Sequence, residues 1–168
     1  MTRGVLLKSG AALALAGALP SFASADPLPE GDLAYLRLLV GVELLTLDFS
    51  SSNSGYTTMH ADDTAHYNGL VNLLGMSGVV AATSDDVDFT YPKNAKPADL
   101  AVTLKTLSVG AYAGALENVQ SSATRLPLAQ ILVNESQQLS ALKGGVGKPF
   151  GPALTIDQVS TALDEYES

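Results

Sequence analysis

Four stretches of the sequence have the apolar periodicity of amphipathic helices, and each carries polar or charged side chains within its apolar stripe. A carboxylate on the buried face of a helix is costly unless it meets a cation, a metal ion or a network of hydrogen bonds. One such residue could be an accident of register, but four helices with the same feature indicate one shared buried site. The residues are Glu43, Asp63 with His66, Lys105, and Glu135 with Gln138.

The helical stretches are separated by runs rich in glycine, serine and proline, which predict turns. Asp32 is predicted to cap the first helix, Pro127 to lie in the first turn of the fourth, and Thr155 to cap a short helix in the tail. The predicted helices span residues 32 to about 50, about 57 to 76, 97 to about 121, 124 to 142, and about 156 to 166.

The second and third helices are joined by about 20 residues, from Ser77 to Pro97. Two antiparallel neighbours need only a short loop, so a connection of this length predicts a crossover along the bundle. Within it Val87, Phe89 and Tyr91 alternate with polar residues, which indicates a short extended segment lying on the helices. The expected fold is therefore all-α, a four-helix bundle with a long crossover and a short C-terminal helix.

The first 25 residues have the three-part layout of a secretory signal peptide. Arg3 and Lys8 give a basic start, residues 9–19 form an apolar run, and Ala23-Ser24-Ala25 matches a cleavage site. The apolar run is too short for a stable membrane anchor. We expect export to the periplasm, cell envelope or medium. The start also resembles a twin-arginine export motif, with Gly4 in place of the second arginine, so both export routes stay open.

Charge and composition exclude several classes of function. Removal of the signal segment leaves 7 basic against 17 acidic residues, a net charge of −10, which argues against nucleic-acid binding and docking on anionic lipid. There is no cysteine, so thiolate metal sites and cysteine nucleophiles are excluded. The remaining chain suits one domain. We expect a linker at 26–31, the bundle at 32–145 and a tail at 146–168.

Two of the predicted helices each carry a carboxylate followed three residues later by another polar side chain. Carboxylate-bridged di-metal bundles use one Glu from each of two helices and a Glu-x-x-His pair from each of the other two. Asp63 and His66 have that spacing with Asp in place of Glu, and Glu135 and Gln138 have it with Gln in place of His. Glu43 would supply the single carboxylate of the first helix.

Six short sequence segments, from the long helices, the crossover and the tail, occur in an order that resembles one known protein family. They are Val42 to Phe49, Asp62 to Leu70, Asp88 to Pro92, Val109 to Ala115, Ile131 to Leu139 and Ala153 to Val159. Through them the chain resembles the secreted ferritin-like domains of bacteria that are related to desiccation-associated proteins. The resemblance covers most of residues 32 to 163. It implies a ferritin-like bundle with a di-metal site.

The chain departs from that family at the residues that matter most for a metal. Lys105, seven residues before Tyr112, stands closest to where the third helix would supply a Glu, and Gln138 replaces the fourth-helix His. An amide is a poorer transition-metal ligand than imidazole, and an ammonium repels a divalent cation. We therefore expect a degenerate site in which Lys105 pairs with Glu43 or Glu135. The alternative is that Lys105 extends to the surface.

Two functions remain open from the sequence. The first is a structural, binding or self-assembling protein of the envelope or stress response, with no cofactor and no catalytic residue. In that case Lys105, Tyr112 and Gln138 line the degenerate metal site. Tyr112 is then a core residue whose hydroxyl bonds a buried carboxylate. The second is a metal-binding protein with residual iron oxidase or storage activity. Its candidate ligands for iron or another divalent metal are Glu43, Asp63, His66 and Glu135. The high apolar content also predicts a homo-oligomer.

Overall fold

The computed structural model describes residues 27–145 and 151–168, and within them every regular element is helical. The expected signal segment and residues 146–150 of the tail lie outside the described residues. No helix in the described part is long and apolar enough to cross a membrane. The all-α prediction is confirmed. The elements are α1 (Glu30–Ser51), the 3-10 helix η1 (Ser54–Tyr56), α2 (Thr57–Gly75), α3 (Pro97–Asn118), α4 (Ser122–Leu142) and α5 (Ile156–Asp164).

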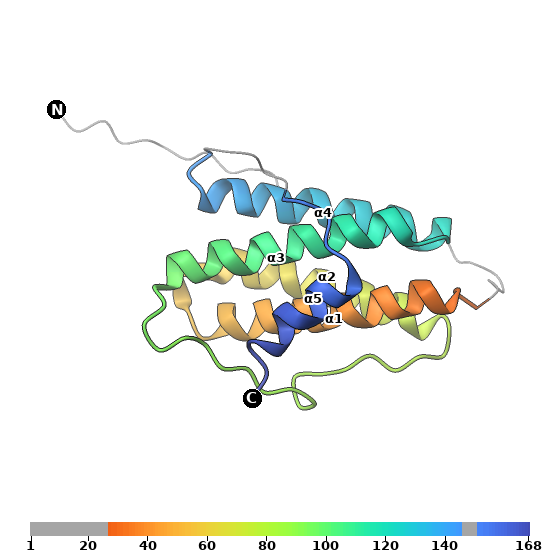
Figure 1. Ribbon diagram of the computed structural model, residues 1–168, viewed down its shortest axis with the longest axis horizontal. Helices are drawn as coiled ribbons and strands as arrows, with labels where there is room; N and C mark the ends of the chain where they lie inside the picture. Colours follow the sequence, from red (N-terminus) through yellow and green to blue (C-terminus); the bar gives the residue numbers. More distant parts are fainter. Residues whose placement is uncertain (1–26, 146–150) are drawn as a thin grey trace.

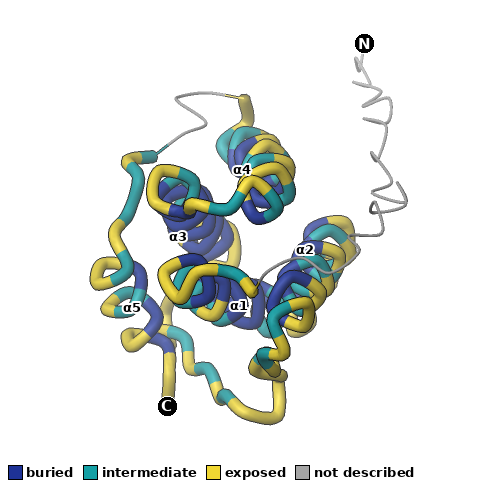
Figure 2. The backbone as a smooth tube through the Cα atoms, turned by 90° about the vertical axis from the view of Figure 1, so that its right-hand side faces the viewer, coloured by how far each residue is buried: buried dark blue, intermediate teal, exposed yellow. Residues whose placement is uncertain are grey.

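The four long helices form a bundle around one interior (Figures 1 and 2). Helix α1 packs against α2 and α3, while α4 packs against α3 and α2. Seen from the end, the buried sides of the four helices face one another, and α5 lies outside against α1 and α3 (Figure 2). Leucines such as Leu36, Leu70, Leu104 and Leu128 are fully buried, one from each long helix. Burial of such side chains drives the assembly of the bundle.

Two of the predicted helix starts are wrong. Helix α1 begins at Glu30 after Pro29, so Asp32 lies inside its first turn and does not cap it. Helix α4 begins at Ser122, two residues earlier than expected, because the side chain of Ser121 accepts a hydrogen bond from the Ala123 amide. Pro127 therefore lies in the second turn of α4.

Asp32 has a different role, which links distant parts of the chain. Its buried carboxylate accepts hydrogen bonds from the backbone amides of Gln120 (2.8 Å) and Ser121 (2.9 Å), at the junction between α3 and α4. Amides at the start of a helix have no partner within the helix, and a carboxylate there is also favoured by the helix dipole. Asp32 thus anchors the start of α1 to the start of α4.

The long connection between α2 and α3 runs along the bundle as an extended segment (Figure 1). Val87, Phe89 and Tyr91 are partly buried against the core, as their alternation predicts. The segment also meets the C-terminus, because Phe89 forms an antiparallel bridge with Glu167 and the Thr90 amide donates to the Tyr166 carbonyl at 2.7 Å. The crossover and the tail therefore hold each other in place.

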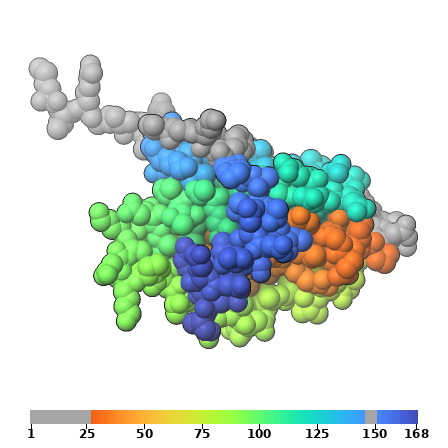
Figure 3. All heavy atoms as spheres, in the orientation of Figure 1, coloured from red at the N-terminus to blue at the C-terminus, as the bar shows by residue number. Residues whose placement is uncertain are grey.

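The tail before α5 crosses α3 at two glycines. The Leu154 amide donates to the Gly110 carbonyl at 2.9 Å, and a Cβ at Gly114 would lie 1.8 Å from the Leu154 carbonyl oxygen. In the space-filling view the C-terminal segment lies directly on the α1 and α3 side of the bundle (Figure 3). The capping box predicted by Thr155 is present, with Gln158 as its partner. Small side chains on α3 are what allow this close approach.

We predict that Gly114→Ala destabilises the protein whereas Gly69→Ala does not. Both glycines lie inside long helices, but a Cβ at Gly69 meets no atom within 4 Å. Gly69→Ala should raise the free energy of unfolding by about 0.5–1 kcal/mol through helix propensity. Gly114→Ala should lower it by about 1–3 kcal/mol because the tail backbone must move. Urea unfolding measures both; equal gains in the two variants would contradict the close contact with Leu154.

Candidate functional site

The four long helices bring six polar side chains together in the middle of the bundle. All six are buried, with at most 2% of any residue exposed. Helical spacing accounts for this, because Asp63 and His66 are one turn apart on α2 and therefore face the same point. The central cluster consists of Glu43 from α1, Asp63 and His66 from α2, Lys105 and Tyr112 from α3, and Glu135 from α4.

Lys105 is the cation at the centre of this cluster. Its ammonium donates to Asp63 Oδ1 at 2.5 Å and to the two oxygens of Glu135 at 2.8 and 3.0 Å. The side chain is 0% exposed, so it does not extend to the surface. Pairing with Glu135 agrees with one of the two expected partners. The other partner is Asp63, and Glu43 makes no hydrogen bond to Lys105 in the structure.

Glu43 is held by a tyrosine instead. The Tyr112 hydroxyl donates to Glu43 Oε1 at 2.5 Å, which is the contact with a buried carboxylate that we expect for this tyrosine. The second oxygen, Oε2, is buried and has no hydrogen-bond partner. A phenol is a neutral donor, so it stabilises a negative charge less than an ammonium does. Glu43 is therefore the carboxyl group of the cluster with the weakest support for its ionised form.

His66 lies among the three carboxylates. Its Nδ1 is 3.1 Å from Glu135 Oε1, 3.7 Å from Glu43 Oε1 and 4.0 Å from Asp63 Oδ1. The contact with Glu135 is close enough for a hydrogen bond, but its direction is unfavourable, and Nδ1 has no partner of good geometry. Asp63 Oδ2 is likewise buried without a partner. The cluster thus retains unused hydrogen-bonding capacity.

Burial and the neighbouring charges shift the pKa values of the cluster in opposite directions. Burial, together with the nearby charge of Glu135, raises the pKa of Glu43 well above its usual range. Burial also raises the pKa of Asp63, although Lys105 opposes the shift. For Glu135 burial acts in the same sense, but Lys105 and His66 outweigh it and lower its pKa. Burial alone would lower the pKa of Lys105, yet the surrounding carboxylates raise it, so the ammonium stays charged.

The four candidate metal ligands are close enough to share one ion. Glu43, Asp63, His66 and Glu135 each offer a ligand atom, and these atoms lie within 4.8 Å of one another. The residues do not fit a two-metal centre, however. The central cluster has one imidazole instead of two, and the Lys105 ammonium already bonds two of the four ligand residues.

Gln138, which we expect to line the site, makes its hydrogen bonds elsewhere. Its amide nitrogen donates to Asn134 at 2.8 Å and to Asp62 at 3.1 Å, and the residue is only half-buried. Its partners lie on α2 and α4, and Gln138 makes no hydrogen bond to the central cluster.

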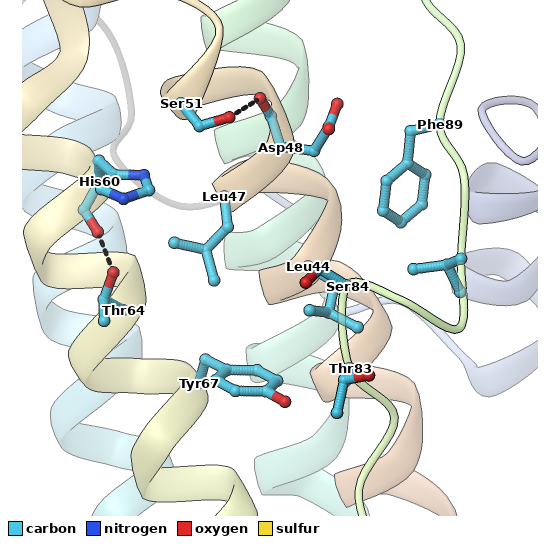
Figure 4. Close-up of a pocket in the computed structure, with 11 residues that line it drawn as sticks. Leu44, Leu47, Asp48, Ser51, His60, Thr64, Tyr67, Thr83, Ser84 and Phe89 are labelled. Carbon is cyan, nitrogen blue, oxygen red and sulfur yellow. Dashed lines mark hydrogen bonds between the residues drawn. The ribbon is translucent and has the colours of Figure 1, made fainter.

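A cavity that the sequence did not predict lies between α1, α2 and the crossover. Its volume is about 380 Å³, and Leu44, Leu47 and Phe89 give it an apolar lining (Figure 4). Asp48 and His60 lie at its edge; the Asp48 carboxylate accepts from the Tyr91 hydroxyl at 2.8 Å, and His60 Nδ1 is 3.0 Å from Ser50 Oγ. His60 is thus the histidine outside the central cluster. The cavity depends on the position of the crossover, which periodicity within helices does not determine.

We predict that Glu43→Gln changes the pH dependence of stability. The unfolded chain releases the Glu43 proton near the ordinary pKa of 4.5, whereas the folded chain keeps it to higher pH because that pKa is raised. The folded state then binds more protons, so this residue costs the wild type stability as pH rises, by at most about 1.4 kcal/mol per pH unit. Glutamine imitates the neutral acid and avoids this loss.

Urea unfolding between about pH 4.5 and pH 7 tests this linkage. The free energy of unfolding of Glu43→Gln should rise relative to that of the wild type across the range. Glu117→Gln, at an exposed position of α3, serves as the control for loss of a carboxylate outside the cluster. A pH-independent difference for Glu43→Gln would show that Glu43 is ionised in the folded protein.

Comparison with known proteins supports the fold from an independent direction. No curated protein matches the chain. The family model described as "Ferritin-like domain" matches residues 44–148, which is more than half of the sequence. That range runs from the α1 residue next to Glu43 through α2, the crossover, α3 and α4. The chain therefore belongs to the ferritin-like domain family.

Proposed function

We propose that this protein is an exported ferritin-like domain that works without metal, as a structural or self-assembling component of the cell envelope or its stress response. The observation that carries the proposal is the position of the Lys105 ammonium, 2.5 Å from Asp63 and 2.8 Å from Glu135. A fixed cation at that point supplies the charge that a metal would otherwise bring. The layout of residues 1–25 supports export.

The electrostatics of the cluster favour this proposal over a two-metal site. A metal ion placed among the same carboxylates would meet an ammonium that is fully buried. Two cations in a low-dielectric interior repel strongly, and displacement of Lys105 would leave it buried and unpaired. The described residues offer it no other acidic partner within hydrogen-bond distance. Lys105 therefore competes directly with metal.

A second candidate function is a single-metal site with residual iron oxidase or storage activity. The observation that favours it is the set of unpartnered buried atoms, Glu43 Oε2, Asp63 Oδ2 and His66 Nδ1. Together with Glu135 these residues offer the carboxylate and imidazole ligands that iron and zinc accept. In this case Lys105 would have to release both of its carboxylate partners.

Metal titration distinguishes the two functions. We predict that the wild-type protein, after incubation with Fe(II) or Zn(II) and gel filtration, retains no stoichiometric metal by elemental analysis. Lys105→Met removes the charge but keeps an unbranched side chain, so this variant should gain binding of one Zn(II) per chain. Lys96→Met, which removes an exposed lysine just before α3, should behave as the wild type.

The outcomes separate the proposals plainly. One tightly bound metal per wild-type chain would contradict the metal-free proposal and support the second function. Absence of metal from both the wild type and Lys105→Met would show that another feature of the cluster excludes metal. Circular dichroism of Lys105→Met with and without Zn(II) monitors folding, because buried carboxylates without a cation destabilise the variant by about 3–5 kcal/mol.

We also propose that the protein associates with further copies of itself. The outer face of α4 exposes Leu126 (65% exposed) and Val133 (54%), which are two helical turns apart and thus on one side. We predict that light scattering gives a mass above that of one chain, and that Leu126→Gln with Val133→Gln shifts it towards the monomer. Val80→Gln, in the crossover, is the control. A monomeric wild type at high concentration would contradict self-association.

A further inference from the structure

The cavity between α1, α2 and the crossover combines an apolar lining with one carboxylate whose hydrogen bonding is incomplete. We propose that it binds small primary amines that carry an apolar body, with Asp48 as the partner of the ammonium and Leu44, Leu47 and Phe89 against the body. These four residues line one space of about 380 Å³ (Figure 4). No residue of the central cluster lines it, so the proposal goes beyond the proposed function and is independent of it.

The Asp48 carboxylate is held in place with one oxygen left for a ligand. Tyr91 of the crossover donates its hydroxyl to Oδ2 at 2.8 Å. Within residues 27–145 and 151–168, no donor bonds Oδ1 and no lysine or arginine forms an ion pair with this carboxylate. The side chain lies on the side of α1 that faces Phe89 (Figure 4). An ammonium would supply both a donor to Oδ1 and the opposite charge.

The charges around the cavity favour a cation over an anion. Asp48 is the one acid among the lining residues, which include no lysine or arginine. Asp85 and Asp86 follow the rim of the cavity along the crossover and are exposed, so they add negative potential at the entrance. His60 also lines the cavity, but its Nδ1 already lies 3.0 Å from Ser50 Oγ. That ring nitrogen is therefore engaged with α1 and is not offered to an anion.

The apolar lining explains why a bare ammonium ion is not the expected ligand. Leu44 and Leu47 from α1 and Val87 and Phe89 from the crossover present hydrocarbon surface to the same space. Covering such surface favours binding, and an aromatic ring near the carboxylate adds a favourable contact for a cation. Ligand pockets range from about 300 to 1,000 Å³. The volume of this cavity thus suits a ligand of one ring with a short chain.

The fold itself fixes the walls of the cavity. Tyr67, which lines it from α2, donates its hydroxyl to the Ala82 carbonyl of the crossover at 2.8 Å. Beyond the cavity, the Thr90 amide donates to the Tyr166 carbonyl at 2.7 Å, so the tail holds the crossover at its other end. A site whose walls are already ordered loses less conformational freedom on binding. The crossover therefore serves as a fixed wall of the site.

Titration of the full chain with 2-phenylethylamine, followed by two-dimensional amide NMR, tests the proposal. We expect saturable shifts confined to residues 44–51, 60–67 and 83–89, with a Kd of about 1 mM. 2-Phenylethanol has the same body without the charge and should bind at least about fivefold more weakly. 3-Phenylpropionate should not bind at about 10 mM. Absence of saturable shifts with the amine, or binding of the alcohol or the acid as tight as that of the amine, would overturn the proposal.

Two variants with the same change in net charge assign the ammonium to Asp48. Asp48→Asn keeps an acceptor for Tyr91 and should weaken amine binding about tenfold, with little effect on the alcohol. Asp88→Asn removes an exposed acid of the crossover that does not line the cavity, and it should bind the amine as the wild type does. Unchanged amine binding in Asp48→Asn, or an equal loss in both variants, would overturn the assignment. If Asp48→Asn fails to fold, the three-ligand comparison on the wild type still decides.

Discussion

The burial of one ammonium among three carboxyl groups is the constraint on which this bundle depends. Lys105 holds Asp63 from α2 and Glu135 from α4, while Glu43 from α1 reaches α3 through Tyr112. A leucine core tolerates small shifts between helices, because one apolar contact replaces another. A charged pair does not, since a shift of one turn would leave a buried charge without a partner. The cluster therefore sets the relative register of all four helices.

Stability and specificity make different demands on such a cluster. Replacement of a complete buried ion network by well-packed apolar residues is often neutral or stabilising, whereas loss of one member is costly. The stability that Lys105 adds is therefore best compared with that of a bundle whose carboxylates are unpaired, and not with that of a bundle whose core is apolar. Asp32 follows the same logic at the end of the bundle, where one buried carboxylate satisfies two helix-start amides. Both features determine how the helices are positioned relative to one another more than they contribute to the stability of the apolar core.

Much of this arrangement could be predicted from periodicity. The spacing of apolar residues gave the long helices, and the interruptions in those stripes identified Glu43, Asp63, Lys105 and Glu135 as inward-facing. Periodicity could not show that Lys105 prefers Asp63 to Glu43, because that choice depends on distances across the bundle. It also could not show that Asp32 reaches Gln120, 88 positions away in sequence. Local patterns predict the face on which a residue lies, whereas its partner is a property of the tertiary structure.

The balance of charges in the cluster accounts for the protonation expected of its acids. Four carboxylates of a di-metal bundle match two divalent ions in charge. The central cluster of this protein instead holds three buried acids and one ammonium. Because net charge in a dry interior is costly, the remaining imbalance favours uptake of protons. Glu43, which faces only a neutral phenol, is the group best placed to carry one. In the structure Lys105 on α3 thus joins these side chains into an internal ion network.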